Sequence, residues 1–504
     1  MAEFEAEPQK KEVAMKNYKK YLAVDLGGSS GRGIIGKFDG EKFTLDEVHR
    51  FSNDPVISGG VMCWDTLRLF FEIKNALAAS AKDGGIESLA IDTWGVDYGY
   101  IDKNGALMTN PCHYRDGRTA GMEEYIAKTI SRERLYEITG IMPQSINTIY
   151  QLASDRLVRP WLPDNAGAIL MTPDLFSYLL SGEIGCEYTI ASTGGFLDAN
   201  ARAVSAEALA AAGISPELFG KISFPGDVRG KVLPDIVAEC GLGNVSVVSA
   251  PSHDTASAVL AVPCPEDDYL FLSSGTWSIM GVETPDPVIK PEGLAGGFSN
   301  EGGAFGRITL IRNIMGLWLE QESRRQWKRE GDVVSFDDLS RAAAEAKPMR
   351  SIIVPDDPRF SPAGDMPGRI AEYCKETGQP VPETKGEIVR CIFDSLALCY
   401  RHTAEKLESL CGRKYDKIYI VGGGTKEEML SRLTADCTGK TVVAGPAEAT
   451  ALGNIAVQAL AAGEFKDRAE MRAALSTASE TKVYEPSNTS DWDGAYERYL
   501  KLAK

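Results

Sequence analysis

The sequence has few of the residues that build metal centres and disulfide frameworks. Its four histidines are widely spaced, and none of its ten cysteines belongs to a CxxC pair. Neither a zinc site nor a redox motif is therefore indicated. No signal peptide is recognised, so free thiols in a reducing cytoplasm are expected. A bridge between Cys374 and Cys391 is conceivable, but nothing in the sequence requires one.

Two further absences restrict the function classes. No apolar run approaches the length needed to cross a membrane, so no membrane association is expected. The formal net charge is −17, whereas a nucleic-acid surface needs basic patches to neutralise phosphates. An anionic substrate would have to be met by local groups such as a metal, backbone amides and a few arginines. With 504 residues, 43% of them hydrophobic and 25% charged, the chain is typical of a globular enzyme with two or more domains.

What the sequence does contain is a glycine-rich hairpin near its start. Strands are predicted at 21–26 and 32–38, with Asp25 ending the first and Gly27–Gly31 at the tip. Such a tip exposes backbone N–H groups and hydroxyls that could hold phosphate oxygens, and Asp25 could hold the accompanying Mg²⁺. We expect the glycines to supply positive φ for the chain reversal. Because Arg32 leads into another strand, this is no Walker loop; an ordinary glycine-rich hairpin is the alternative.

A second hairpin repeats this pattern. Strands predicted at 269–273 and 279–282 flank the tip Ser274–Ser278, and a proline- and acid-rich stretch at 262–268 precedes them as a candidate domain boundary. The repeat suggests two related halves that share phosphate binding. Asp25 has no carboxylate counterpart in the second copy, so only the first half would offer a metal ligand.

Polar residues follow two further buried strands. Asp92-Thr93-Trp94-Gly95-Val96-Asp97 ends a strand predicted at 86–92, in a position common for ligand contacts in α/β proteins. Asp254 follows a strand at 245–250 and precedes a helix at 256–261, close to the positive end of a helix dipole that favours its ionised form. A helix N-cap is the alternative for Asp254, and His253 could be a buried core residue or a supporting donor.

Several other elements are predicted from periodicity and glycine content. A helix at 65–81 is expected to place Leu67, Phe70, Phe71, Ile73 and Leu77 on one face. Residues 296–304 are expected to form a glycine-rich loop. A long helix from Arg312 to Arg329 would place Asn313 and Gln321 near one face. Three glycines at 422–424 join a strand to a helix and would let a flat group approach the backbone, and Gly453 would permit close helix packing.

Taken together, these features match the requirements of phosphoryl transfer. Two hairpins could hold phosphates, Asp25 a magnesium ion and the glycine triplet a nucleotide, while Asp254 could orient and deprotonate an attacking hydroxyl. A carboxylate near pKa 4 is a weak base toward a sugar hydroxyl. It suffices if the proton leaves late, as the phosphoryl group is captured.

The ordered motifs resemble the FGGY sugar kinases of the actin-like ATPase superfamily. The resemblance extends from about Tyr21 to Tyr484 and is most specific at Asp-Thr-Trp-Gly-Val-Asp and Ser-His-Asp-Thr. It implies an α/β fold of two actin-like (ribonuclease H-like) domains, each a mixed sheet with flanking helices, around a catalytic cleft. The implied units are a disordered leader at 1–20, an N-terminal domain at 21–263, a C-terminal domain at 264–484 and a tail at 485–504.

The same resemblance implies ATP-dependent phosphorylation of L-rhamnulose at its 1-hydroxyl. Asp254 would be the proton acceptor, with Gly95, His253, Thr255 and Asn313 at the ketose. The expected ATP contacts are Gly28, Ser29, Ser30, Gly31, Arg32, Thr276, Gln321 and Gly423. Gly28 stands where alanine is usual in the family, and the polar leader is extra. Another ketose or polyol such as L-fuculose or L-xylulose, or a non-kinase actin-like ATPase, is the alternative; the oligomeric state is not readable from the sequence.

Overall fold

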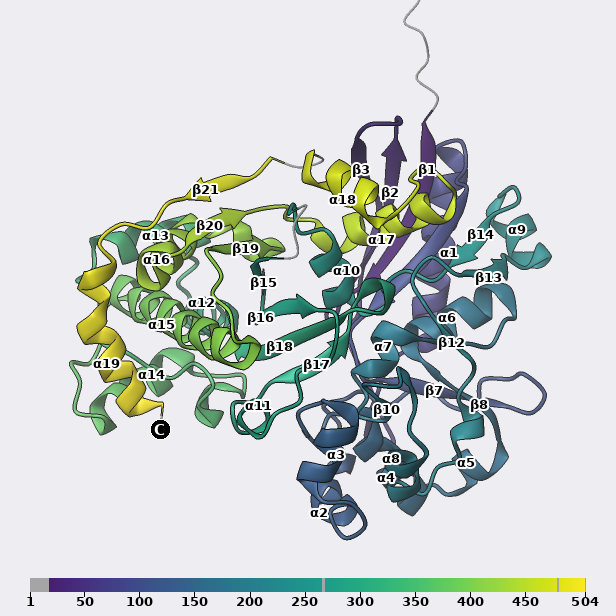
Figure 1. Cartoon of the computed structure of the whole chain (residues 1–504), viewed down its shortest axis with the longest axis horizontal. Helices are drawn as coiled ribbons and strands as arrows, with labels where there is room; N and C mark the ends of the chain where they lie inside the picture. Colours follow the sequence, from purple (N-terminus) through teal and green to yellow (C-terminus); the bar gives the residue numbers. More distant parts are fainter. Residues whose placement is uncertain (1–17, 265–267, 478–479, 504) are drawn as a thin grey trace, which may run out of the picture.

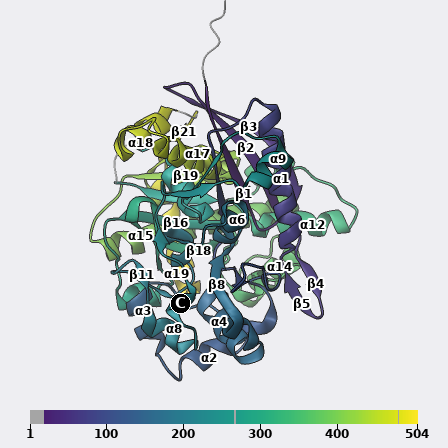
Figure 2. The same cartoon turned by 90° about the vertical axis from the view of Figure 1, so that its right-hand side faces the viewer.

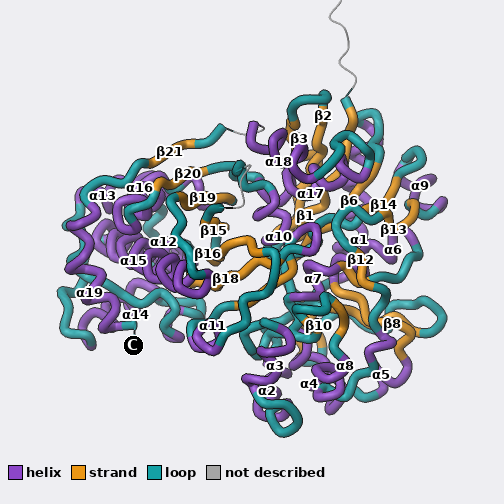
Figure 3. The backbone as a smooth tube through the Cα atoms, viewed as in Figure 1, coloured by secondary structure: helices purple, strands orange, loops and turns teal. Residues whose placement is uncertain are grey.

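The computed structural model describes residues 18–264, 268–477 and 480–503. It has two lobes, each built on a mixed β-sheet, with helices outside and between them (Figures 1 and 3). Of the leader expected at 1–20, residues 1–17 lie outside the described residues, and the first strand begins at Lys19. The expected boundary at 263/264 adjoins residues 265–267, which also lie outside them, so the domain limits stay predictions.

The first sheet has six strands with the first hairpin near its centre. Strand β1 pairs antiparallel with β2 and parallel with β6, while β3 and β14 extend the two sides. In spatial order the strands are β13 (Val228–Lys231), β14 (Ser246–Val248), β6 (Ser88–Thr93), β1 (Lys19–Leu26), β2 (Ser30–Phe38) and β3 (Phe43–Ser52).

The second sheet repeats this arrangement and adds one antiparallel strand, β17, at one edge. Strand β15 takes the place of β1, pairing antiparallel with β16 and parallel with β19. In spatial order the strands are β17 (Ser299–Gly302), β18 (Ile308–Met315), β16 (Trp277–Thr284), β15 (Leu270–Ser274), β19 (Lys417–Val421), β20 (Thr441–Ala444) and β21 (Lys482–Tyr484). The two related halves expected from the repeated hairpin are therefore present as two sheets of matching order.

Helices and short strand pairs complete the fold. The short pairs are β4 (Val56–Ser58) with β5 (Val61–Cys63), β7 (Tyr98–Asp102) with β8 (Ala166–Met171), β9 (Cys186–Glu187) with β12 (Ile222–Ser223), and β10 (Leu197–Asp198) with β11 (Ala203–Val204). The helices of the first half are α1 (Thr66–Lys82), α2 (Met122–Ile126), α3 (Arg132–Thr139), α4 (Thr148–Val158), α5 (Trp161–Asn165), α6 (Thr172–Ser181), α7 (Tyr188–Ser192), α8 (Ala206–Ala211), α9 (Pro234–Cys240) and α10 (Asp254–Leu260). Those of the second are α11 (Pro291–Ala295), α12 (Trp318–Arg329), α13 (Phe336–Glu345), α14 (Met366–Glu376), α15 (Lys385–Cys411), α16 (Glu428–Thr438), α17 (Ala449–Ala461), α18 (Arg468–Thr477) and α19 (Asp493–Leu502).

Strand β1 is buried on both faces, and the two faces meet different helices. Leu22 and Val24 belong to a core with α1, whereas Tyr21 and Ala23 belong to a core with α10 and α17. That second core also includes residues of β15 and β19, so α10 and α17 form a helix layer between the two sheets. Figure 1 shows α10 and α17 in this position, and the view in Figure 2 places α17 near β1 and β19.

Glycine makes the close contact between these two helices possible. A Cβ on Gly453 of α17 would overlap the carbonyl oxygen of Ser257 in α10, as expected for this glycine. Asn454 and Gln458 of α17 reach across to the first sheet: Asn454 donates to Asp92 Oδ2 at 2.6 Å, and Gln458 donates to the carbonyl oxygen of Leu22 at 3.0 Å. The second half is thus joined to the first sheet by packing and by buried hydrogen bonds.

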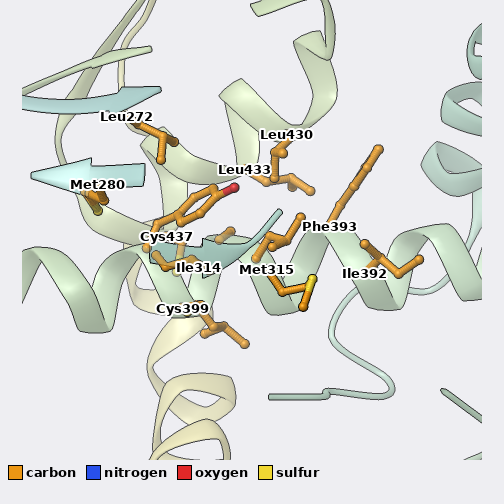
Figure 4. Packing of buried hydrophobic residues seen from close by; sticks show 14 of the residues in the cluster. Leu272, Met280, Ile314, Met315, Ile392, Phe393, Cys399, Leu430, Leu433 and Cys437 are labelled. Atoms are coloured by element: carbon orange, nitrogen blue, oxygen red, sulfur yellow. The ribbon is translucent and has the colours of Figure 1, made fainter. Parts of the chain in front are cut away.

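The outer core of the second half surrounds α15. Ile392 and Phe393 of this helix belong to the same buried hydrophobic core as Leu430 and Leu433 of α16 (Figure 4). The helix spans Lys385–Cys411 and begins with a capping box at Thr384 and Glu387. Its length and cap provide a rigid support behind β15 and β16.

Three sequence expectations are wrong in detail. Helix α1 buries Leu69, Ile73, Ala76 and Leu77, whereas Leu67 and Phe71 are 69% and 48% exposed. The stretch at 296–304 contains strand β17, because its residues pair with β18. Residues 308–315 are strand and the following helix begins only at Trp318, so Asn313 and Gln321 do not share a helix. The strand prevails because β18 pairs along its whole length with β16.

Candidate active site

A cavity of about 440 Å³ brings together residues of both halves. Six of the residues expected to bind substrate or nucleotide line it: Gly95, His253, Asp254, Thr255, Asn313 and Gly423. The remaining wall comes chiefly from the aromatic residues Trp94, Tyr114 and Trp277, the hairpin tip Ser273–Gly275, and Asn147, Thr193, Ser299, Glu301 and Thr450.

Asp254 presents its two carboxylate oxygens differently. It is the first residue of α10, so His253, not Asp254, occupies the N-cap position. Its Oδ1 accepts hydrogen bonds from the Thr255 backbone N–H at 2.6 Å and the Thr255 hydroxyl at 3.2 Å, and lies 3.4 Å from His253 Nε2. No hydrogen bond from the described residues reaches Oδ2. One oxygen is therefore held in place while the other is left for a group in the cavity.

Charge and burial set the proton affinity of this carboxylate. Burial raises the pKa of Asp254, the neighbouring His253 lowers it, and the charge of Asp25 raises it again. The net direction is upward, because loss of hydration outweighs the charge of His253 and the hydrogen bonds from Thr255. A raised pKa makes the carboxylate a better proton acceptor than a surface aspartate.

The turn that carries His253 and Asp254 is fixed by a buried carboxylate that the sequence reasoning missed. Glu187, fully buried, accepts hydrogen bonds from the backbone N–H of Ser252 at 3.1 Å and from the hydroxyl of Thr189 at 2.6 Å. Thr189 Oγ1 in turn accepts from the His253 backbone N–H at 3.1 Å. Burial raises the pKa of Glu187 to about 7. In the sequence, Glu187 is distinguished only by its place directly before the short helix that begins at Tyr188.

Gly95 precedes a strained residue in the cavity wall. Val96 has φ of +68°, in the left-handed region that β-branched residues avoid. Its N–H donates to Thr193 Oγ1 at 3.0 Å, and its carbonyl accepts from the Thr148 hydroxyl at 2.6 Å. A Cβ on Gly95 would lie 3.1 Å from Thr193 Oγ1. The loop is thus held tightly against Thr193, and a larger residue at position 95 would crowd this contact.

Asp97 anchors the aromatic wall beside this loop. Its Oδ2 accepts from Trp64 Nε1 at 2.6 Å, from Trp94 Nε1 at 3.0 Å and from the Tyr114 backbone N–H at 3.2 Å. The rings of Trp64 and Trp94 lie 4.0 Å apart between centroids. Burial raises the pKa of Asp97 to about 6, against these hydrogen bonds. Trp94 is therefore held in a fixed orientation at the cavity.

The tip of the first hairpin reverses the chain as expected, but it does so without positive φ at its glycines. Gly28 and Ser29 are exposed at the tip, but no tip glycine has positive φ, so that expectation is wrong. The tip is closed by a hydrogen bond from Gly27 N–H to the Ser30 carbonyl at 2.9 Å and by Asn53, which donates to the Gly27 carbonyl at 2.7 Å. Gly31 is required because a Cβ there would overlap the Phe51 ring.

Asp25 and Arg32 lie next to each other at the base of this hairpin. Arg32 Nη2 contacts Asp25 Oδ2 at 2.5 Å, and its Nη1 contacts Glu448 Oε2 at 2.5 Å, just before α17. Arg32 therefore links the first hairpin to the second half. None of the residues 25 and 28–32 is part of the cavity wall, although Gly28 lies beside Tyr114, which is. Their roles toward ATP and metal stay predictions.

The second hairpin contacts α12 through Thr276 and Gln321, two of the residues that were expected to bind the nucleotide. The Thr276 hydroxyl donates to Gln321 Oε1 at 3.1 Å, and Trp318 N–H donates to the Thr276 carbonyl at 3.0 Å. Gly422 has φ of +86°, and a Cβ on Gly424 would overlap Ser274. Gly423 faces open space between them. Asn313 reaches the cavity from β18 and not from a helix.

A magnesium ion fits the residues around Asp25. Among the described residues, no three histidine, cysteine, aspartate or glutamate side chains could hold a metal by themselves. Mg²⁺ needs fewer protein ligands, since it keeps several waters and binds one or two carboxylates plus phosphates. Asp92 pairs with Asp25 in the β1–β6 register, and its buried Oδ1 has no partner in the part of the chain that the structure describes. Burial and the charge of Asp25 raise the pKa of Asp92 well above its usual range, so a cation at this place would help to keep both carboxylates ionised.

Comparison with known protein families identifies this arrangement. The model of the N-terminal domain of the FGGY family of carbohydrate kinases matches residues 20–261, and that of the C-terminal domain matches residues 270–462. The chain belongs to the FGGY family of carbohydrate kinases. It is accordingly an enzyme of the sugar-kinase class, in agreement with the resemblance seen in its sequence.

Individual FGGY kinases match over nearly the whole chain. A rhamnulokinase of Bacteroides thetaiotaomicron is 43% identical over 477 residues, covering 94% of this chain and 98% of the relative. One of Enterococcus faecalis is 38% identical and covers 98% and 99%. A ligand-bound xylulose kinase of Lactobacillus acidophilus shares the fold with a TM-score of 0.81 at 16% identity, covering 96% of this chain and 97% of its own. The expected two-domain kinase fold is therefore confirmed.

Two further observations concern the sequence expectations. All ten cysteines, including Cys374 and Cys391, are free thiols in the structure. None of the helices in the described ranges is long and apolar enough to cross a membrane.

Proposed function

We propose that this FGGY kinase transfers the γ-phosphoryl group of ATP to the 1-hydroxyl of L-rhamnulose. The observation that supports it most directly is the free Oδ2 of Asp254 in a cavity shared with the glycine triplet. Rhamnulokinases that are about 40% identical over nearly the full length support the choice of ketose. The ten free thiols fit the reducing cytoplasm expected for such an enzyme.

In this proposal, the residues of the first half bind and activate the ketose. Gly95, the Trp94 ring, His253 and Thr255 surround it from the first half and Asn313 from the second, and Asp254 Oδ2 accepts the hydroxyl proton. Proton transfer accompanies capture of the phosphoryl group, so the carboxylate need not ionise the alcohol beforehand. The walls from both halves exclude water that would otherwise accept the phosphoryl group.

ATP would be held by the first hairpin and by the second half of the molecule, which contains the second hairpin, Gln321 and Gly423. The tip Gly28–Arg32, in which Gly28 and Ser29 are exposed, and Thr276 would face phosphate oxygens. Gln321 and Gly423 would contact the rest of the nucleotide. Asp25 would hold Mg²⁺, which neutralises phosphate charge when it is bound. Arg32 stays paired with Asp25 and Glu448, so its task is to orient this carboxylate as well as to offset phosphate charge.

Identification of the product tests the proposal. The protein is incubated with ATP, MgCl₂ and L-rhamnulose, and the mixture is followed by ³¹P NMR. We expect ADP together with a sugar phosphate whose phosphorus couples to the protons on C1, and no product when EDTA replaces magnesium. Phosphorylation at another carbon, or ADP without a sugar phosphate, contradicts the proposal.

A further inference from the structure

His253 lies between two carboxylates that belong to different halves of the molecule. Its Nδ1 is 3.1 Å from Glu301 Oε2, and its Nε2 is 3.4 Å from Asp254 Oδ1. Glu301 is on β17, at the edge of the second sheet, whereas His253 and Asp254 begin α10 after the first. A neutral imidazole has only one N–H, so a ring that faces an anion on each side is favoured as the imidazolium.

Glu301 is held where it can reach His253. Its neighbour Asn300 donates its backbone N–H to the Gly140 carbonyl at 2.8 Å, and Gly302 donates its own to Ser192 Oγ at 2.7 Å. Both acceptors are in the first half. The strand that carries Glu301 is thus fastened to the first half on either side of it, and Glu301 is only 9% exposed.

We propose that Glu301 is a positioning residue for phosphoryl transfer, which fixes the protonated His253 ring so that Asp254 turns Oδ2 toward the ketose hydroxyl. This rests on the proposed kinase reaction. His253 Nε2 and both donors of Thr255 face the same oxygen, Asp254 Oδ1, so rotation of the carboxylate is restricted. The positive charge also keeps Asp254 ionised beside the other carboxylates.

The surrounding charges agree with this role. Burial lowers the pKa of His253, but Glu301, Asp254 and Glu187 outweigh it and raise the pKa to about 9. Asp25 acts on Asp254 in the opposite sense to His253, because a second negative charge raises the pKa of a carboxyl group. Without the imidazolium, Asp254 would take up a proton at a higher pH and would no longer be an acceptor.

Glu301→Gln tests the proposal because it removes the charge with little change of shape. The first measurement is ¹⁵N NMR of histidine-labelled protein at pH 8, with signals assigned through His49, His113 and His402 variants. We expect two protonated ring nitrogens at His253 in the wild type and a neutral ring in Glu301→Gln. The pKa of His113 is lowered to about 4 and that of His402 is lowered, so those rings are neutral at this pH. This measurement does not depend on any substrate.

The second measurement is the pH profile of kcat/KM for the ketose. In Glu301→Gln we expect the acidic limb to move up by about one pH unit, which is a tenfold loss on that side, with the KM for ATP unchanged. Glu301→Asp should restore part of the loss, and it provides the test if the glutamine variant does not fold. Glu292→Gln, an exposed carboxylate on α11, is the matched control and should leave both measurements unchanged.

Each outcome is decisive. An unchanged His253 signal in Glu301→Gln overturns the proposal. A raised KM for the ketose with an unshifted pH profile also overturns it, because Glu301 would then bind the substrate directly. If the wild type phosphorylates a different ketose, the proposed substrate fails but the profile measured with that ketose still tests Glu301.

Discussion

The replacement of Asp254 by asparagine separates the contribution of this residue to proton transfer from its contribution to substrate and nucleotide binding. An asparagine oxygen in the place of Oδ1 can still accept both hydrogen bonds from Thr255, so the start of α10 should keep its geometry. The amide NH₂ then takes the place of Oδ2 and cannot accept a proton. Substrate and nucleotide sites therefore remain while the reaction loses its base.

The expected loss follows from the usual contribution of a general base. Removal of such a base lowers the rate by about 10²–10⁴, which corresponds to about 3–5 kcal/mol in activation free energy. The assay is steady-state ADP release with MgATP and L-rhamnulose, together with ATP titration by calorimetry. We expect kcat to fall in this range and the Kd for ATP to change less than threefold.

A matched control is available in the same half of the molecule. Asp235 is an exposed aspartate in the first turn of α9, and Asp235→Asn should leave kcat unchanged. If Asp254→Asn kept more than a tenth of the wild-type kcat, Asp254 would not be the proton acceptor. If it lost ATP binding as well, the argument from separate carboxylate oxygens would be wrong.

Three other changes test the energetics and the nucleotide site. Burial raises the pKa of Glu320 to about 8. The folded protein therefore binds one proton more than the unfolded chain between about pH 4.5 and 8, and its stability falls as the pH rises through that window. In urea unfolding, Glu320→Gln should increase the free energy of unfolding by up to about 4 kcal/mol more at pH 8 than at pH 5. Gly453→Ala should cost about 1–3 kcal/mol and lower Tm, because its Cβ overlaps the Ser257 carbonyl. Gln321→Ala should raise the KM for ATP about tenfold through loss of its contact with Thr276, with the KM for ketose unchanged.

Each of these changes has a control on a comparable element. Glu330→Gln, at the exposed end of α12, should show no gain at pH 8. Gly494→Ala adds a Cβ that meets nothing within 4 Å in α19 and should not destabilise the protein. Gln326→Ala lies on the same helix as Gln321 and should leave the KM for ATP unchanged. A pH-independent effect at position 320, a stable Gly453→Ala, or a shifted ketose KM at position 321 would each refute the corresponding reasoning.

The sequence allowed the hairpins and the Asp254 turn to be predicted because their signals are local. Alternating apolar residues around Gly27–Gly31 and around Gly275 define a strand, a tip and a strand within a short stretch. The helix start at Asp254 follows an apolar strand directly. Such patterns need no knowledge of the rest of the chain, and the structure confirms both hairpins and the strand-to-helix turn, although the helix begins at Asp254 and not at residue 256.

The features that were predicted wrongly or were missed depend on contacts between distant segments of the chain. Residues 308–315 have a pattern compatible with a helix, and only pairing with β16 decides for a strand. Glu187 and Glu301 show no local signal in the sequence, and Asp97 was expected at a position for ligand contacts and not as a support for Trp64 and Trp94. Their importance comes from burial against partners such as Ser252, which lies 65 residues from Glu187 along the chain. Single-sequence periodicity carries no information about such pairings.

The most direct test of the central claim is the specificity of ATP turnover. ADP release is measured with MgATP and each of L-rhamnulose, L-fuculose, L-xylulose, D-xylulose and glycerol, and without any acceptor. The account predicts that L-rhamnulose gives the highest kcat/KM, with little ADP formed when no acceptor is present. A higher kcat/KM for another acceptor would contradict the proposed substrate, and equally fast ADP release without any sugar would contradict the kinase mechanism itself.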